Sequence, residues 1–173
     1  HHLKDLDYNP KEYLPHIYGK FREKGAHVKV RPLMPTPAEG DLPFPPKMNK
    51  TEEKALKYIP DLSNFGFSKQ EIAAKPDSRA CYKFKGGEAN GLKRMNEYIF
   101  GKKSVGHYND TRNHLRGSEY SSKLSPWLAN GCLSARKVYF ATHEFMKVHR
   151  SNESTRVFID ELFWRDFNKY WFM

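Results

Sequence analysis

Apolar residues recur at helical spacing through the second half of this 173-residue chain. Three helices are predicted there, over residues 86–100, 135–150 and 152–172. Their inward-facing apolar residues are, in the same order, Leu92, Met95, Tyr98, Ile99 and Phe100; Val138, Phe140, Ala141, Phe145 and Val148; and Phe158, Leu162, Phe163, Phe167, Tyr170 and Trp171. No stretch alternates convincingly with a period of two, so the pattern predicts a mainly α fold.

The first half of the chain has a weaker pattern. Asn9 followed by Pro10 predicts the start of a helix near residues 10–24, with Pro15 tolerated in its first turns and a stop at Gly25. Residues 32–46 contain six prolines in fifteen positions and predict an extended, linker-like stretch. From residue 47 to residue 85 the pattern predicts irregular chain with one short helix near 68–74. We therefore predict a linker region over 1–85 and a helical domain over 86–173.

Charge narrows the classes of partner. The net charge is +10, which favours a polyanion such as nucleic acid, a phosphorylated cofactor or an anionic lipid surface, although a basic solvated surface is an equal alternative. The apolar content of 38% is below the roughly 45–50% of ordinary globular domains, while aromatic residues are plentiful. This composition is typical of a domain that rests on a partner or belongs to something larger.

Cysteine and hydropathy patterns bear on the compartment. Cys81 and Cys132 stand far apart, without a metal or redox spacing, which favours a reduced compartment inside the cell, with an organelle or the nucleus both compatible. No apolar run is long enough for a membrane span. The eight histidines form no metal-ligand pattern, so we predict no metal site and assign no catalytic residue.

A serine-rich stretch over residues 120–136 is the first candidate for chemistry. Ser125 before Pro126 predicts a capped helix start, and the hydroxyls of Ser121 and Ser122 stand near it with Lys123. Free N–H groups, hydroxyls and a cation together suit a phosphate group. Ordinary helix capping is the alternative.

Two further motifs carry polar and aromatic groups. Glu161 and Arg165 are four residues apart on the last predicted helix with Trp164 between them, so they form either a surface ion pair or a wall for a planar ligand or nucleobase. Tyr108, Arg112 and Arg116 follow one another at four-residue spacing, which suits an adenine and phosphate ligand, a nucleic-acid backbone or a solvated helix face.

Taken together, these motifs resemble the photolyase/cryptochrome family, most closely its cryptochrome DASH form. The resemblance rests on "GGEANGLKRMNEYIF", "YNDTRNHLRGSEYSSKLSPWLANGCLSAR" and "NESTRVFIDELFWRDF", in that order and at that spacing. Residues around "LPHIYGKFREK" and "VKVRPLMPTP" resemble the linker between that family's two domains. The resemblance implies the N-terminal part of the helical FAD-binding domain, preceded by a long Pro-rich linker.

The resemblance also implies which residues bind FAD. Those carried over by motif are Tyr108, Ser121, Ser122, Lys123, Leu124, Ser125, Phe158, Glu161 and Arg165. Among them, the serine segment would hold the pyrophosphate. Glu161 and Trp164 would also face a pyrimidine dimer in nucleic acid. Phe158 stands where some relatives have Trp, and Lys123 replaces an Arg, which keeps the charge but loses the forked geometry.

In repair-competent relatives, light-excited reduced FAD donates an electron to a pyrimidine dimer, and DASH members favour single-stranded DNA; other members sense light. We expect this chain to lack the antenna domain and the electron-transfer half of the flavin pocket. It is therefore not expected to hold an antenna folate alone, and apolar helix faces would need the missing domains or another protein to cover them. The alternative is a flavin-free relative that serves as a structural or RNA-contacting subunit of a larger complex.

Overall fold

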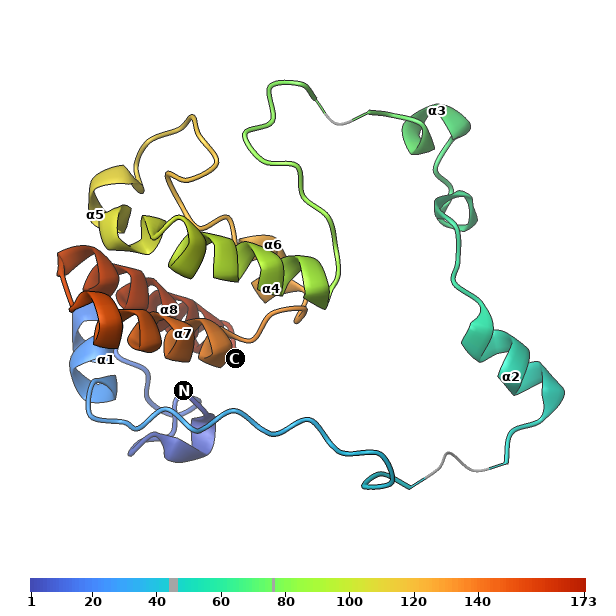
Figure 1. The fold of residues 1–173 in the computed structure, drawn as a ribbon. Coiled ribbons are helices and arrows are strands. Elements are labelled where there is room, and N and C mark those ends of the chain that lie inside the picture. Colours follow the sequence, from blue (N-terminus) through green and yellow to red (C-terminus); the bar gives the residue numbers. More distant parts are fainter. Residues whose placement is uncertain (44–46, 76) are drawn as a thin grey trace. The chain divides into compact units, whose positions relative to one another are not determined.

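The computed structural model describes residues 1–43, 47–75 and 77–173, and in these ranges the chain is helical without a β-strand (Figure 1). The mainly α prediction is therefore confirmed for the described residues. The chain divides into two compact units. The first, here called the helical body, comprises His1–Leu33 together with Cys81–Met173, and the second, the 34–80 segment, comprises Met34–Ala80. The predicted boundary at residue 85 refers to the domains of a longer protein and stays a prediction.

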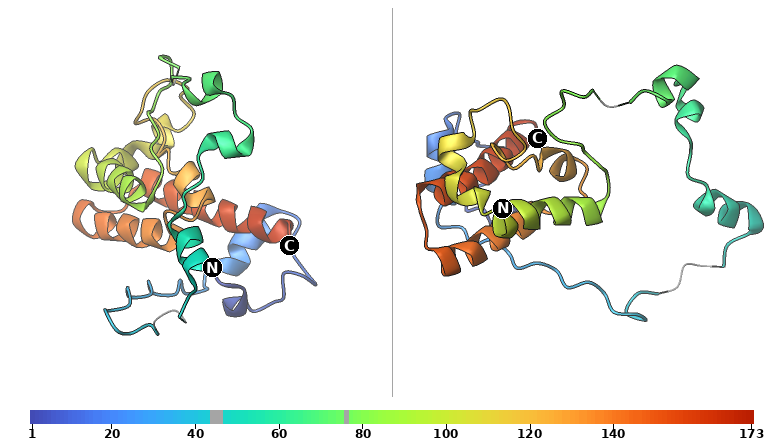
Figure 2. Two further views of the ribbon diagram at one scale, coloured as in Figure 1. Left: turned by 90° about the vertical axis from the view of Figure 1, so that its right-hand side faces the viewer. Right: turned by 45° about the horizontal axis from the view of Figure 1, so that its top comes forward.

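The helical body is built around α8 (Glu153–Trp171), its longest helix. Three helices contact it: α1 (Tyr18–Gly25), α5 (Tyr108–Thr111) and α7 (Ala135–His149). The 3₁₀-helix η4 (Ser104–His107) also packs against it. α7 and α8 contact each other, and Figure 2 shows the helical body from two further sides. The last helix of the chain is the one that joins the others.

The remaining elements of the body complete this arrangement. α4 (Glu88–Asn96) continues into a π-helical turn, η3 (Glu97–Gly101), which contacts α7 and η4. The short α6 (Ser125–Ala129) follows the serine-rich stretch, and the 3₁₀-helix η1 (Leu3–Asp5) lies near the start of the chain. The three predicted helices correspond to α4 with η3, α7 and α8.

One main core forms from residues that are distant in sequence. Its buried members are Met95, Tyr98, Ile99, Val105, Leu124, Trp127, Leu133, Val138, Ala141, Phe145 and Phe158. A smaller cluster joins Phe21 of α1 to Phe167 and Tyr170 of α8. Burying aromatic and aliphatic side chains is the dominant favourable term in folding, so these two clusters hold the helices together.

Three residues predicted to face inward are exposed: Phe100, Val148 and Trp171. Phe100 lies in the π-helical turn, whose wider winding rotates it off the face shared by Met95 and Ile99. Val148 and Trp171 lie in the last turns of their helices, where fewer packed neighbours cover a side chain. The predicted face was wrong at these three positions.

α8 begins where the predicted 152–172 helix does, with Asn152 as its capping residue. The Asn152 side chain accepts a hydrogen bond from the Thr155 N–H at 2.9 Å, and the Thr155 hydroxyl accepts one from the Asn152 N–H at 3.1 Å. The Asn152 amide also donates to the Gly106 carbonyl at 2.8 Å, which ties the start of α8 to η4. This cap therefore connects two elements as well as closing one helix.

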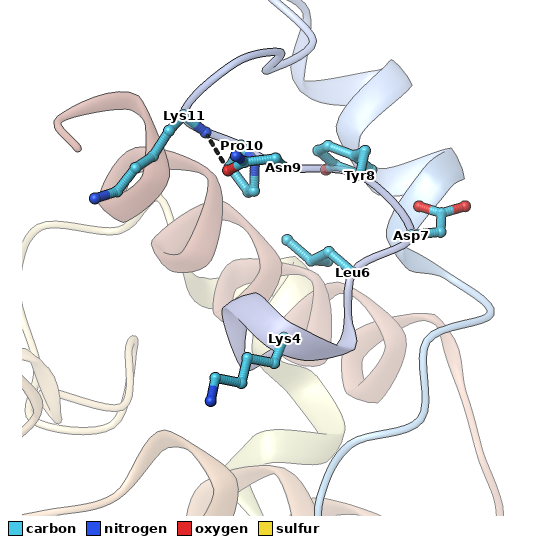
Figure 3. A pocket seen from close by; sticks show the side chains of 7 residues that line it. All are labelled: Lys4, Leu6, Asp7, Tyr8, Asn9, Pro10 and Lys11. Atoms are coloured by element: carbon cyan, nitrogen blue, oxygen red, sulfur yellow. Dashed lines mark hydrogen bonds between the residues drawn. The ribbon is translucent and has the colours of Figure 1, made fainter.

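The helix predicted near 10–24 was placed too early. Only Tyr18–Gly25 is helical in α1, and Asn9 instead closes a single turn by accepting from Lys11 N–H (Figure 3). Pro15 explains the difference, because a proline lacks the N–H that the helix needs and its ring clashes with the preceding turn. The stop at Gly25 is where the sequence places it.

Close packing of α4 on α6 depends on a glycine. A Cβ atom at Gly91 would lie 3.0 Å from Cγ and Cδ1 of Trp127, tighter than ordinary van der Waals contact. The Trp127 ring is itself held by a hydrogen bond from Nε1 to the Lys85 carbonyl at 3.0 Å. Gly91 thus lets the buried indole approach the helix backbone.

The described residues of the 34–80 segment form local structure without a buried core. It contains α2 (Lys50–Lys57), which the sequence pattern did not predict, the 3₁₀-helix η2 (Leu62–Phe65), and α3 (Lys69–Ile72), which lies within the predicted 68–74. No described residue of this segment is buried. Of the Pro-rich stretch 32–46, residues 32–38 form neither helix nor strand, and residues 44–46 lie outside the described residues. Its role as a linker stays a prediction.

Within the described ranges, no helix combines the length and the apolar character that crossing a bilayer requires.

Candidate functional site

A cavity of about 350 Å³ opens where α5, α6, α7 and α8 meet. Its lining residues are Tyr108, Ser122, Leu124, Ser125, Leu128, Ala129, Val138, Phe158, Glu161, Leu162 and Arg165. Seven of the nine cofactor-binding residues predicted from the sequence are in this lining. Residues spread over 58 positions of sequence, from 108 to 165, therefore meet at one site.

The floor of the cavity is apolar and closely packed. Phe158 is 4% exposed and presents its ring edge-on to Tyr108, with the ring centroids 5.0 Å apart. Leu124 and Val138 are buried in the same core cluster. Such walls favour a flat, apolar group over a hydrated ion.

Charged groups lie on the rim, in a pairing that the sequence did not predict. Glu161 bonds Arg112, which follows α5, with Nη1 to Oε1 at 2.5 Å. Arg165 instead approaches Asp166 at 3.8 Å. Of the two interpretations of Glu161 and Arg165, the ion pair is replaced, because α5 packs on α8 and brings Arg112 to the Glu161 carboxylate, while both residues line the cavity.

Tyr108 is a neutral hydroxyl at this site. Burial, followed by the negative charge of Glu161, raises the pKa of Tyr108 to about 12. At neutral pH it can donate and accept hydrogen bonds but carries no charge.

The serine segment enters the cavity through an unusual backbone turn. Lys123 has a left-handed φ of +59°, and its Nζ donates to the Ser121 hydroxyl at 2.9 Å. Neither residue lines the cavity, whereas Ser122, Leu124 and Ser125 do. Ser125 is the first residue of α6 and not its cap, because the chain turns into helical geometry at Leu124, directly after the left-handed residue.

Arg94 belongs to the surroundings of the site, although the sequence motifs did not point to it. It is 1% exposed and donates to the carbonyl oxygens of Ser118, Ser121 and Ser122. The sequence did contain a sign of this burial, since Arg94 lies on the same apolar helix face as Met95 and Tyr98. A charged residue on an apolar face is almost never buried unless it is paired, so its position indicates a partner in the interior.

Trp164 does not join the cavity. Its ring stacks on Tyr18 of α1, with centroids 3.6 Å apart and an angle of 11° between the planes, and the residue stays 39% exposed. Glu161 and Trp164, the pair predicted to face nucleic acid, are thus separated: Glu161 lies at the cavity and Trp164 against α1.

A second hollow, of about 450 Å³, lies at residues 4–11 (Figure 3). Its lining comes from η1 and the residues that follow it, with Lys4 and Lys11 among the residues drawn. None of the predicted site residues is there. Among the described residues no group of histidine, cysteine, aspartate or glutamate could hold a metal ion.

Comparison with known proteins supports the same resemblance. No family model matches the sequence. Cryptochrome DASH of Gloeobacter violaceus is 36% identical over 160 residues, covering 92% of this chain and 30% of that protein. Cryptochrome DASH of Synechocystis is 34% identical over 171 residues, covering 98% and 32%.

A solved structure agrees. The crystal structure of a Synechocystis cryptochrome superposes with a TM-score of 0.72 at 31% identity, over 98% of this chain and 32% of that one. The helical arrangement is thus that of cryptochromes. The chain belongs to the photolyase/cryptochrome family, and the relatives that it resembles are cryptochrome DASH proteins. It spans about a third of their length.

Proposed function

We propose that this chain is part of a cryptochrome DASH-like flavoprotein and contributes one side of an FAD site at the cavity. The observation that carries the proposal is the convergence of Tyr108, Ser122, Leu124, Ser125, Phe158, Glu161 and Arg165 on one cavity. The family resemblance implies that these residues bind FAD, and they were chosen from it before the fold was considered. Residues chosen at random along a helical chain would not share one opening.

The chemistry of the lining fits the parts of FAD. The apolar floor at Phe158, Leu124 and Val138 suits a flat ring system. Ser122, Ser125 and Arg165 supply hydroxyl and guanidinium donors for ribose or pyrophosphate oxygens. When bound, FAD would supply the light-absorbing and electron-donating chemistry.

The size of the cavity limits what it holds. Small-molecule sites usually occupy about 300–1,000 Å³, so 350 Å³ lies at the lower end. A dinucleotide would extend beyond it and need further contacts. We therefore assign this site the role of partial support, with weak affinity when it acts alone.

The proposed reaction partners follow from the family resemblance and the charge. A net charge of +10 suits single-stranded DNA, on which the complete protein would carry out light-driven repair of pyrimidine dimers or act as a light sensor. Glu161 would face the lesion across the cavity. Because Tyr18 covers one face of Trp164, a base would have to stack on the opposite face.

One observation favours a second candidate, a flavin-free structural or RNA-contacting subunit. The 34–80 segment exposes Leu56, Ile59 and Phe65 together with many lysines, a composition suited to contacts within a larger assembly. This candidate needs no ligand in the cavity. Flavin binding therefore distinguishes the two.

The test is an equilibrium titration of FAD against the 173-residue chain, read from flavin fluorescence and absorbance. Ala129 lines the cavity and is exposed, so Ala129→Trp should obstruct it without disturbing the core. We expect this variant to weaken FAD binding at least about tenfold, since the indole would replace contacts worth more than about 1.4 kcal/mol.

The matched control is Asn130→Trp, one residue further along and outside the cavity lining. It should bind FAD like the parent chain. Saturable binding that both variants leave unchanged would place FAD elsewhere and refute the assigned site. No saturable binding by the parent chain would favour the second candidate.

A further inference from the structure

The side chain of Arg94 contacts the serine segment from inside the body. It lies on α4, its side chain is fully buried, and α4 itself contributes nothing to the cavity lining. A guanidinium never loses its charge in a protein, so each of its donors must find an acceptor in the interior. The positions of these acceptors indicate the structural role of Arg94.

Most of these acceptors belong to the backbone just before the cavity. Nη2 donates to the Ser118 carbonyl at 2.5 Å and to the Ser121 carbonyl at 3.4 Å, and Nε donates to the Ser122 carbonyl at 2.9 Å. One planar group therefore binds three carbonyl oxygens within five residues. This geometry fixes the direction of the backbone, because the donors of a planar guanidinium have fixed directions and the carbonyl oxygens must lie along them.

The charge of Arg94 is balanced locally. Nη1 lies 3.1 Å from Oε1 of Glu119, and the carboxylate of Glu119 also accepts from Lys102 Nζ at 3.1 Å and from the Ser118 hydroxyl at 2.8 Å. The rings of Tyr82 and Tyr98 lie near the guanidinium carbon, at 4.8 and 5.2 Å from their centroids. With its donors engaged and its charge paired, Arg94 is not itself an anion site.

The backbone that Arg94 holds leads directly into the left-handed turn at Lys123. Immediately after the Ser122 carbonyl held by Arg94, Lys123 adopts its left-handed conformation. Side chains with a Cβ avoid this conformation, and it persists only where the surroundings impose it. The turn sends Leu124 into the core and leaves Ser122 and Ser125 at the cavity.

We infer that Arg94, supported by Glu119, is a positioning residue: it holds the 118–122 backbone so that the serine segment presents its hydroxyls to the ligand of the cavity. The inference about the ligand rests on the proposed FAD site, whereas the inference about the backbone does not. Arg94 touches no ligand and acts through residues 118–125.

The test compares Arg94→Met with Met95→Ala by hydrogen exchange on the complete chain. Met95 is the adjacent buried residue of α4, and it packs in the core without a hydrogen bond to the segment. We expect Arg94→Met to raise exchange of the amides of 118–124 at least about tenfold more than that of α7 and α8, because the three carbonyl oxygens that Arg94 binds all lie in this segment and its backbone would open when they are released. Met95→Ala should loosen the body without this selectivity.

A rescue distinguishes positioning from simple packing. Lys123→Gly removes the penalty of the left-handed conformation, so it should partly restore protection of 118–124 in the Arg94→Met background. If Arg94→Met does not fold, Arg94→Lys keeps the charge but loses the fork, and the same selective exchange is expected. Wild-type exchange in the segment of a folded Arg94 variant would overturn the inference.

The FAD titration supplies the second readout. In Arg94→Met we expect weaker FAD binding than in Met95→Ala. A loosened segment with unchanged FAD affinity would overturn the assigned role at the cavity. A loosened segment in a chain that binds no FAD, even as wild type, would refute the proposed function and leave the backbone clamp supported.

Discussion

The helical body and the 34–80 segment both contain helices with well-formed N-terminal caps. They differ in how many apolar side chains those helices bury. α2 in the segment and α8 in the body both begin with an asparagine capping box, at Asn49 and Asn152. Phe158 of α8 is 4% exposed, whereas Phe65 of the segment is 65% exposed. Both regions thus contain a capping box and large apolar residues. Among the described residues, only the helical body buries such residues in a core.

The difference shows which interactions are local. A cap satisfies N–H groups within about three residues of itself, so any chain that carries the right residues can form it. A core needs apolar faces from distant elements to meet, as Met95, Val138 and Phe158 do. Short helices without such packing are marginal in water. We therefore expect global stability to come from the body alone.

The largest expected effect tests that division directly. Phe158→Ala removes a buried ring and leaves a cavity, and it should lower the free energy of unfolding by about 3–5 kcal/mol. Phe65→Ala removes an exposed ring and should change it by less than about 0.5 kcal/mol. Urea denaturation followed by circular dichroism measures both. A large loss from Phe65→Ala would mean that the segment has a packed partner, which would end the contrast.

A smaller effect compares the two capping boxes. Asn152→Ala removes the cap of α8 and its hydrogen bond to the Gly106 carbonyl, and should lower global stability by about 1–2 kcal/mol. Asn49→Ala removes an equivalent cap from α2 and should leave global unfolding unchanged while amide exchange in 50–57 accelerates. Equal global losses from the two variants would show that α2 unfolds together with the body.

The smallest effect is a dependence on pH. Burial opposes the charge of Glu119, but hydrogen bonds from Ser118, Lys102 and Arg94 outweigh it and lower the pKa of Glu119 below its ordinary 4.5. The resulting stabilisation is present above that ordinary value and is lost as the pH falls through the lower folded-state pKa. We expect less than about 1 kcal/mol, since the carboxylate keeps contact with solvent. Denaturation from about pH 6 down to about pH 3 should show a shallower acid decline in Glu119→Gln.

Glu71 is the carboxylate of the 34–80 segment that can be compared with Glu119. Hydrogen bonds from the Ser68 N–H and hydroxyl also lower the pKa of Glu71, but this carboxylate is fully exposed. Its protonation should loosen only the cap of α3. Glu71→Gln should therefore leave the acid decline of global stability as it is in the parent chain, and a change there would contradict the division between the two regions.

The candidate site was predictable to the extent that it is encoded in contiguous motifs. Ser122, Leu124 and Ser125 belong to one motif, and Glu161 with Arg165 to another. The family resemblance could therefore propose both as cofactor-binding without showing that they line one cavity. The pairing of Glu161 with Arg112 was not predictable, because it depends on how α5 packs against α8. The stacking of Trp164 on Tyr18 was not predictable for the same reason, since Tyr18 is on a helix far earlier in the chain.

The sequence by itself determined the mainly α character, the start of α8 at Asn152, the stop of α1 at Gly25 and the membership in a family. Each of these rests on residues that act within a few positions of themselves or on a pattern of residue types. Only the tertiary structure decided that Arg94 is buried, that Lys123 adopts a left-handed turn, and that the cavity forms between four helices. The reason is physical: a buried charge, a strained turn and an enclosed cavity each exist only when distant elements supply the acceptors and the walls.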